Sequence, residues 1–504
     1  MTKLDSLIVL INSMDTSDKR YFQLNTKMYE GKKDYQLLFE LIDQSGLSAD
    51  SVKAKFKKQK PEGSFEIICN HLYNLLLDKL SARESEKEVE FQVLKAYQQA
   101  KFLSKRNLFD DAFQLIEKYK AMALEYELFS HFLIMAKLEI RFFHQFEFKE
   151  MDENKLVKLQ SKIESVSRQQ RAIENHTGLY NLISIRQIKQ GTIRNEGEKE
   201  KLNDLAFNEL QAVSGQVKNS FEAQKLHLLF QSAYFIKTNN PKSSLKVYYE
   251  LNTLFENNRK LWGSPPYFYL SHLKGILNNL RWFGHYNEMP FFIGKIKLLL
   301  TDESSAKNYI QNLIFLFESL ILTDQQRYKQ ALLHLENQET ELIDKNAGQP
   351  FVSRAELTLQ LATVYFWNQE YKKALKIIRP LLNVGKPFLQ APQVKTIRFI
   401  NMLIHLEQKD FDYLDSEIRS FDRSLKKKDK PFRSEEIILN VIRNSCRQTD
   451  LGKRTKFIEE QIRKLKELNH DQYENQLLKM FNFIYWLEKK IKNWKQLLIN
   501  MSSI

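Results

Sequence analysis

The stretch that decides the fold is SRAELTLQLATVYFWNQEYKKALKIIRP, residues 353–380. Its apolar side chains recur at helical spacing in two stripes, and the pattern loosens between them at residues 367–370. The small side chains of Ala362 and Ala374 stand where two helices must approach closely. Because a helical hairpin of this kind cannot bury its apolar faces alone, the stretch predicts neighbours of the same design.

Composition favours helices throughout the chain. Among 504 residues there are 14 glycines and 10 prolines, well below the roughly 12 per cent that the two contribute on average. Little material is therefore present for tight turns or strand hairpins. The chain also has 43% hydrophobic residues and 35 phenylalanines, which supply ample core. Its length fits either several compact domains or one elongated repeat array, and the composition favours the array.

Further hairpins recur along the second half of the sequence, at residues 225–251, 270–300, 310–335 and 396–421. An aromatic residue opens the second helix of four hairpins: Tyr286, Tyr328, Tyr371 and Phe411, spaced by 42, 43 and 40 residues. A repeat of that length corresponds to two helices and a linker.

The central hairpin resembles the tetratricopeptide repeat. Leu361-Ala362-x2-Tyr365 followed by Ala374-x3-Ile378 is similar to that family's Leu-Gly-x2-Tyr and Ala-x3-Phe pattern. The resemblance implies an all-α fold built as a right-handed solenoid of helical hairpins. It also implies that the first helices of successive hairpins line a concave surface.

Four domains are expected from the patterning. Residues 1–85 form an irregular helical N-terminal domain, 86–216 the first hairpins and long linking helices, 217–432 the tetratricopeptide-like repeats, and 433–504 the closing helices. The charged, glycine-containing stretch at 191–217 is the expected joint between segments. The closing helices are rich in lysine and arginine and are expected to cap the array with a polar outer face.

The N-terminal domain contains a partial helix-turn-helix pattern. A helix, a turn at Gly46 and a second helix span residues 37–58. The second helix is basic and could contact phosphates beside a major groove. The candidate nucleic-acid contacts are Lys53, Lys55, Lys57 and Lys58. The alternative is a plain domain that caps the array, because helical hairpins are common in all-helical proteins.

The sequence contains no recognisable catalytic motif. The glycines are too far apart for a phosphate-binding loop, and neither HExxH nor GxSxG occurs. We expect no catalytic residue, cofactor or metal, and His227, His272 and His405 are expected to pack on apolar faces or hydrogen-bond the backbone. Two cysteines fit a reducing, cytoplasmic location. No apolar run is long enough to cross a bilayer, so no membrane association is expected.

The resemblance nominates a partner-binding groove. If the first helix of each hairpin lines this groove, two sets of residues would face it. They are Asn278, Arg281 and Trp282 in one hairpin and Leu359, Thr363, Phe366 and Trp367 in another. Arg281 could pair with a carboxylate, and the tryptophans could cover an apolar anchor. The alternative is that both tryptophans pack between hairpins.

These observations predict a non-catalytic scaffold or adaptor that binds a protein or peptide. The alternative is a DNA-binding regulator, in which a helix-turn-helix precedes a tetratricopeptide-like sensor array. A third class, an RNA-associated repeat protein, is favoured by the formal charge of +15. The partner's identity and the oligomeric state do not follow from the sequence.

Overall fold

The computed structural model describes residues 2–26, 34–43, 48–61, 64–146, 152–190, 193, 196–213, 220–263, 266–300, 306–338, 350–382, 391–426, 431–447, 450–471 and 474–502. Over these residues the chain is all-helical and contains no strand, which confirms the predicted fold class at the level of all-α. None of the described helices is both long and apolar enough to cross a membrane. The chain divides into two compact units, residues 1–171 and 172–504.

The first unit begins with a small helical core. It is built by α1 (Lys3–Ser13), α2 (Thr16–Thr26), α3 (Asp34–Asp43), α4 (Ala49–Gln59) and α5 (Phe65–Lys87). Leu7, Phe22, Phe39, Phe56 and Leu76 are almost completely buried in it. Ser48 caps α4 by accepting a hydrogen bond from the backbone N–H of Ser51 at 3.4 Å. The predicted turn at Gly46 lies outside the described residues.

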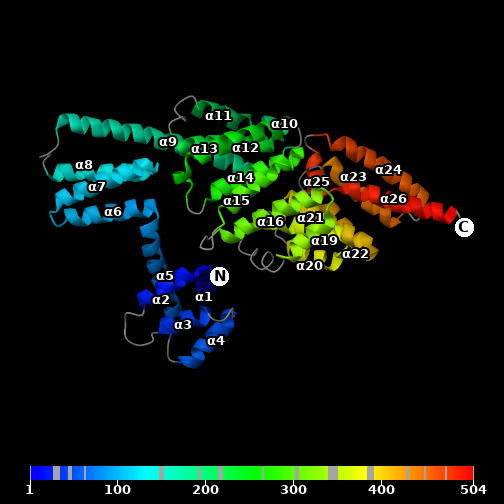
Figure 1. Ribbon diagram of the computed structural model, residues 1–504, viewed down its shortest axis with the longest axis horizontal. Helices are drawn as coiled ribbons and strands as arrows, with labels where there is room; N and C mark the ends of the chain where they lie inside the picture. Colours follow the sequence, from blue (N-terminus) through cyan, green and yellow to red (C-terminus); the bar gives the residue numbers. More distant parts are fainter. Residues whose placement is uncertain are drawn as a thin grey trace. The chain divides into compact units, whose positions relative to one another are not determined.

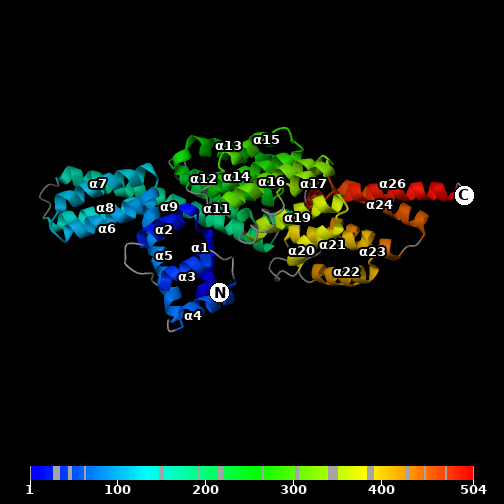
Figure 2. The ribbon, with the colours of Figure 1, turned by 60° about the horizontal axis from the view of Figure 1, so that its bottom comes forward.

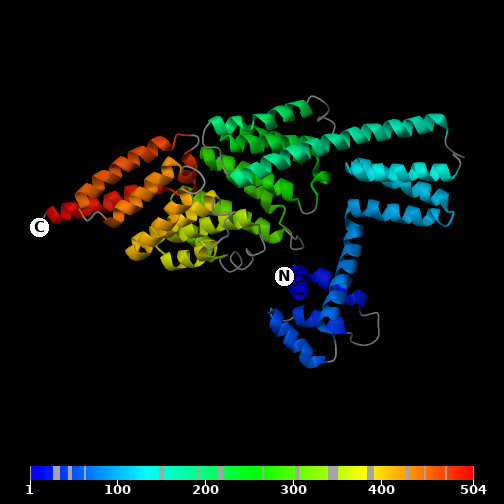
Figure 3. The same cartoon turned by 180° about the vertical axis from the view of Figure 1, so that it is seen from behind.

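Three more helices complete the compact part of this unit. They are α6 (Val89–Ser104), α7 (Phe109–Glu125) and α8 (Phe129–Gln145), which pack against one another as an antiparallel group (Figures 1 and 3). The division between the units falls within the long helix α9 (Glu153–Gln190). The expected joint at 191–217 contains α10 (Glu196–Glu200) and α11 (Asn203–Val213), and the boundary expected at residue 216 lies outside the described residues.

The second unit contains the hairpins that the sequence predicts. Their helices are α12 (Phe221–Lys237), α13 (Pro241–Asn257), α14 (Tyr267–Phe283), α15 (Met289–Lys297), α16 (Lys307–Asp324), α17 (Tyr328–Glu336), α19 (Phe351–Trp367), α20 (Tyr371–Leu382), α21 (Pro392–Glu407) and α22 (Phe411–Lys426). A short 3₁₀ helix, η2 (Arg259–Leu261), follows α13. Each helix packs on the next, and the first helices also pack on one another in the order α14, α16, α19, α21 (Figure 2).

One turn geometry recurs between paired helices. Its central residue is left-handed, with φ between 51° and 73°, at Asn107, Glu127, Asn239, Gly284, Gln326, Gln369 and Lys409. In each case the next backbone N–H donates to the carbonyl five residues earlier, at 2.7–3.1 Å. The four aromatic residues that mark the repeat in the sequence each come two positions after such a residue. Since most of these turns use asparagine, glutamine, glutamate or lysine, the hairpins need few glycines.

Glycine is required at one close helix contact. A Cβ on Gly275 of α14 would lie 2.2 Å from the ring of Tyr248 on α13, so a side chain there would force this buried tyrosine to move. The side of α14 facing α13 is therefore close-packed, and Leu273, Ile276 and Leu277 are fully buried around it.

The C-terminal helices are α23 (Arg433–Arg447), α24 (Leu451–Leu468), α25 (Asn475–Met480) and α26 (Phe483–Ser502). Helices α24 and α26 pack side by side, and α25 contacts both α21 and α23 (Figures 1 and 3). Glu474 caps the start of α23, because its carboxylate accepts hydrogen bonds from the backbone N–H groups of Arg433 and Ser434, both at 3.0 Å. This contact fixes the segment that leads into α25.

Candidate functional site

The predicted groove residues on α14 lie at its C-terminal end. Asn278 is exposed, whereas Arg281 and Trp282 are half-buried. Arg281 binds Asp324 of α16 with both arms of its guanidinium, Nε to Oδ2 at 2.6 Å and Nη2 to Oδ1 at 3.0 Å. The expected carboxylate partner of Arg281 is thus supplied by the chain itself.

Asp324 also organises the neighbouring turn. The hydroxyl of Tyr286 donates to Asp324 Oδ2 at 3.2 Å. Burial of the phenol, together with this carboxylate, raises the pKa of Tyr286 to about 12. Tyr286 therefore remains a neutral hydrogen-bond donor at physiological pH, and three side chains from two hairpins are tied to one another.

A distant segment of the chain lies on this end of α14. Arg281 Nη2 donates to the backbone carbonyl of Lys479 at 3.1 Å. The ammonium of Lys479 lies 3.5 Å from the backbone oxygen of Trp282 and 5.5 Å from the centroid of its indole ring. Two of the three predicted contact residues on α14, Arg281 and Trp282, are therefore engaged by the end of α25.

The predicted groove residues on α19 are covered, and the expectation that they face an open groove is wrong. Leu359, Thr363, Phe366 and Trp367 are only 4–8% exposed. Thr363 donates its hydroxyl to the carbonyl of Leu359 at 2.8 Å, so it satisfies its polar group within α19. For Trp367, the alternative of packing between hairpins agrees with the structure.

The cover over Phe366 and Trp367 comes from the chain's own C-terminal segment. The ring of Phe481 stacks on Trp367 with centroids 5.4 Å apart and meets Phe366 edge-on at 5.3 Å. Tyr485, on the same segment as Phe481, lies 5.3 Å from the Trp367 ring. Tyr328 of α17 also stacks on the Trp367 ring, with the centroids 4.8 Å apart. The closing helices were expected to present a polar outer face, and the structure adds that the end of α25 and the beginning of α26 lie on the predicted groove residues.

A hydrogen bond and an ion pair fix the following turn of α26. The indole N–H of Trp486 donates to Glu407 Oε1 of α21 at 2.9 Å, and Lys490 pairs with the other oxygen of the same carboxylate. Residues 479–490, called the covering segment below, therefore contact α14, α19 and α21 in turn. Together the covering segment and the ends of these helices form the candidate functional site.

The predicted nucleic-acid contacts have a different environment. On α4 only Val52 and Phe56 are buried. The four lysines named from the sequence, Lys53, Lys55, Lys57 and Lys58, are all exposed. The helix thus presents a basic face next to an apolar one.

The three histidines assigned to apolar faces have different partners. His227 hydrogen-bonds the carboxylate of Glu209, and His405 stacks on Tyr413 at 3.8 Å and contacts Asp410 at 2.9 Å, so both have side-chain partners. His272 is buried against the Phe255 ring at 5.4 Å. Burial lowers the pKa of His272 to about 3.

One group among the described residues could hold a metal ion, and sequence analysis missed it. It consists of His176 on α9, Glu209 on α11 and His227 on α12. Its members come from three helices, so no local spacing marks them as ligands. The available signal was weaker: Glu209 and His227 each lie three or four residues from a buried apolar residue on their own helix, and His176 lies seven residues before Ile183.

The chain matches no family model, no curated protein and no solved structure.

Proposed function

We propose that this chain is a non-catalytic scaffold or adaptor that binds a protein or peptide partner. The binding surface is the one formed by the ends of α14, α19 and α21, and the fold is a right-handed solenoid similar to tetratricopeptide arrays. The observation that carries the proposal is that this surface already holds a peptide segment, the chain's own covering segment, through main-chain and aromatic contacts.

The contacts are of the kinds used in peptide recognition. A guanidinium binds a backbone carbonyl of the segment, which requires no particular side chain at that position. An aromatic ring, Phe481, packs against both Phe366 and the indole of Trp367, which selects for an apolar anchor. A partner carrying a similar aromatic anchor beside a basic residue would compete for the same place.

In this proposal the covering segment regulates access. Because it belongs to the same chain, it competes with any free peptide at a high effective concentration, of millimolar order for a short flexible tether. A partner must therefore bind more tightly than the covering segment, or the covering segment must first be weakened.

A direct experiment uses a fluorescent peptide with the sequence of residues 475–486 and the full-length chain. In Phe481→Ala the chain's own anchor is lost, so we expect this variant to bind the peptide at least about tenfold more tightly than the unmodified chain. Adding Arg281→Ala to Phe481→Ala should remove the gain. Equal affinity of the unmodified and Phe481→Ala chains, measured by anisotropy, would overturn the proposed surface.

Partners are then identified by affinity capture from the native cell with mass spectrometry. A partner of this surface should be enriched on the Phe481→Ala chain and lost on Phe481→Ala with Arg281→Ala. A protein captured equally by all three chains binds elsewhere and does not support the adaptor surface.

A second candidate function, DNA binding, is favoured by one observation, the exposed lysines on α4 beside its buried stripe. Such a helix can contact DNA phosphates. The logarithm of the binding constant then falls linearly with the logarithm of the salt concentration, and each phosphate neutralised by a lysine makes the slope steeper by about 0.9. The triple change Lys53→Gln, Lys55→Gln, Lys57→Gln should therefore lower the slope by about 2–3 in a gel-shift titration.

The matched control is the triple change Lys372→Gln, Lys373→Gln, Lys376→Gln, which removes the same charge from exposed positions on α20. If both triples change the slope equally, the binding reflects net charge, and α4 has no special role.

A further inference from the structure

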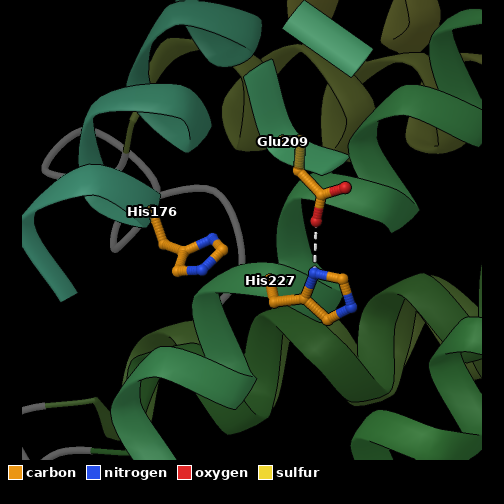
Figure 4. A group of neighbouring side chains, drawn as sticks. All are labelled: His176, Glu209 and His227. Atoms are coloured by element: carbon orange, nitrogen blue, oxygen red, sulfur yellow. Dashed lines mark hydrogen bonds and ion pairs between the residues drawn. The ribbon is translucent and has the colours of Figure 1, made fainter. Parts of the chain in front are cut away.

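Three polar side chains meet where α9, α11 and α12 come together in the second unit (Figure 4). One ligand atom from each of His176, Glu209 and His227 lies within 4.8 Å of the other two. Glu209 and His227 are joined by a hydrogen bond between Oε1 and Nδ1, and the His176 ring approaches them from α9. The His176 and His227 ring centroids are 5.9 Å apart.

Glu209 and His227 satisfy each other through their hydrogen bond, but His176 takes no part in it. Its side chain is fully buried, and neither ring nitrogen has a hydrogen-bond partner within the part of the chain that the structure describes. Buried polar atoms are normally paired, so an unpaired imidazole beside a carboxylate and a second imidazole calls for a ligand. Burial, followed by the neighbouring His227, lowers the pKa of His176, which favours the neutral ring that metals bind.

Burial without partners is not sufficient evidence, as His272 demonstrates. That ring is equally buried and also lacks hydrogen-bond partners among the described residues. It is surrounded by the aromatic rings of Tyr248, Phe255 and Tyr269, and it is not grouped with a second ligand residue. His176 differs because two further ligand groups converge on it.

We infer that His176, Glu209 and His227 bind a divalent transition-metal ion of the zinc class. Two imidazole nitrogens and one carboxylate oxygen are ligands that Zn²⁺ accepts, with a fourth position left for water. At metal–ligand distances of about 2.0–2.1 Å, tetrahedral ligands lie about 3.4 Å apart. The three ligand atoms already lie within 4.8 Å of one another, so small side-chain rotations bring them to this spacing.

The surrounding packing holds the three helices that carry the ligands together before an ion arrives. The same three helices share an apolar cluster that includes Ile183 of α9, Leu205 of α11 and Phe230 of α12. Each ligand lies on the helix face that carries this cluster, because Leu205 precedes Glu209 by one turn, Phe230 follows His227 by nearly one turn and Ile183 follows His176 by two turns. The apolar cluster makes the site dry on one side and strengthens binding there.

Access for the ion comes from the His227 side. The His227 side chain retains 19% of its exposure, compared with 6% for Glu209. Once bound, the ion joins α9, α11 and α12 through its ligands and stabilises their association, because it binds the folded chain and finds no assembled site in the unfolded one.

The test titrates the full-length, chelator-treated chain with Co²⁺ and with Zn²⁺ near neutral pH. Co²⁺ reports its coordination through visible absorption bands, and calorimetry gives stoichiometry and affinity for Zn²⁺. We expect one ion per chain and a rise in melting temperature on addition of Zn²⁺. Glu209→Gln and His227→Gln should each weaken binding by more than about 100-fold and abolish that rise.

His285→Gln is the matched control, because His285 lies 3.2 Å from Glu288 in an exposed histidine–carboxylate pair without a second histidine. This variant should bind Zn²⁺ as the unmodified chain does. The inference is overturned if the unmodified chain takes up no stoichiometric ion, or if Glu209→Gln and His227→Gln, shown by circular dichroism to be folded, bind it unchanged.

Discussion

Two helices singled out by the sequence, α19 and α4, differ in what covers them. On α19 every residue from Leu357 to Trp367 is buried, whereas on α4 only Val52 and Phe56 are. An amphipathic helix has one apolar stripe, and a helix that is apolar on all sides is surrounded by other elements. The sequence LTLQLATVYFW has the second pattern, so its outer face needed a cover, and the covering segment supplies it.

The largest expected effect tests that cover directly. Trp367→Ala should lower the free energy of unfolding by about 3–5 kcal/mol, because it removes a buried ring that stacks on Tyr328 and Phe481. Trp282→Ala, at a half-buried ring, should cost clearly less. Urea denaturation monitored by circular dichroism measures both. Similar small losses would mean that Trp367 faces solvent and that the groove is open.

The next effect concerns the charges that fix the covered surface. Asp324→Asn removes the ion-pair partner of Arg281, which also lies close to Lys479. The side chains of Arg281 and Asp324 are each about one-fifth exposed. We expect a loss of about 2–3 kcal/mol, below the roughly 3–5 kcal/mol for a fully buried pair. Asp415→Asn breaks an exposed pair with Arg419 and should cost less than about 0.5 kcal/mol. Equal losses would show that Asp324 contributes only as a surface charge.

The buried histidine of α14 predicts a pH dependence. The pKa of His272 is 6.5 when the ring is exposed and about 3 in the folded chain, and burial is the main cause of this difference. Between these values the unfolded chain binds a proton that the folded chain does not, so stability falls as the pH falls. His272 should account for about 2 kcal/mol of the loss between pH 7 and pH 5.

His272→Phe should remove this part of the acid sensitivity, and His285→Gln, at an exposed ring, should not. Urea titrations at the two pH values give the difference for each chain. An unchanged difference in His272→Phe would mean that the ring is protonated in the folded state.

Local patterns predicted the hairpins, because the information lies within each hairpin. The break at residues 367–370 coincides with the turn at Gln369, and the repeated aromatic residues follow the left-handed positions by two. These features depend on neighbouring residues, and apolar spacing records them.

The cover and the metal-ligand group depend on contacts between distant residues. Nothing near Trp367 indicates that Phe481 stacks on it, and His176, Glu209 and His227 belong to three different helices. Spacing within one helix fixes a face but not the partner of that face. The apolar stripes of the central hairpin predicted neighbouring hairpins, but they did not predict the covering segment.

The smallest expected effect lies on α4 and sharpens the contrast. Lys53→Gln, Lys55→Gln and Lys57→Gln change exposed side chains, so together they should alter the free energy of unfolding by less than about 0.5 kcal/mol. Phe56→Ala on the same helix should cost about 3–5 kcal/mol, because that ring is fully buried. A large loss from the lysine changes would show that this face is covered, as α19 is. A small loss would show that the fold does not depend on these lysines. Their replacement could then affect the binding of a ligand without affecting stability.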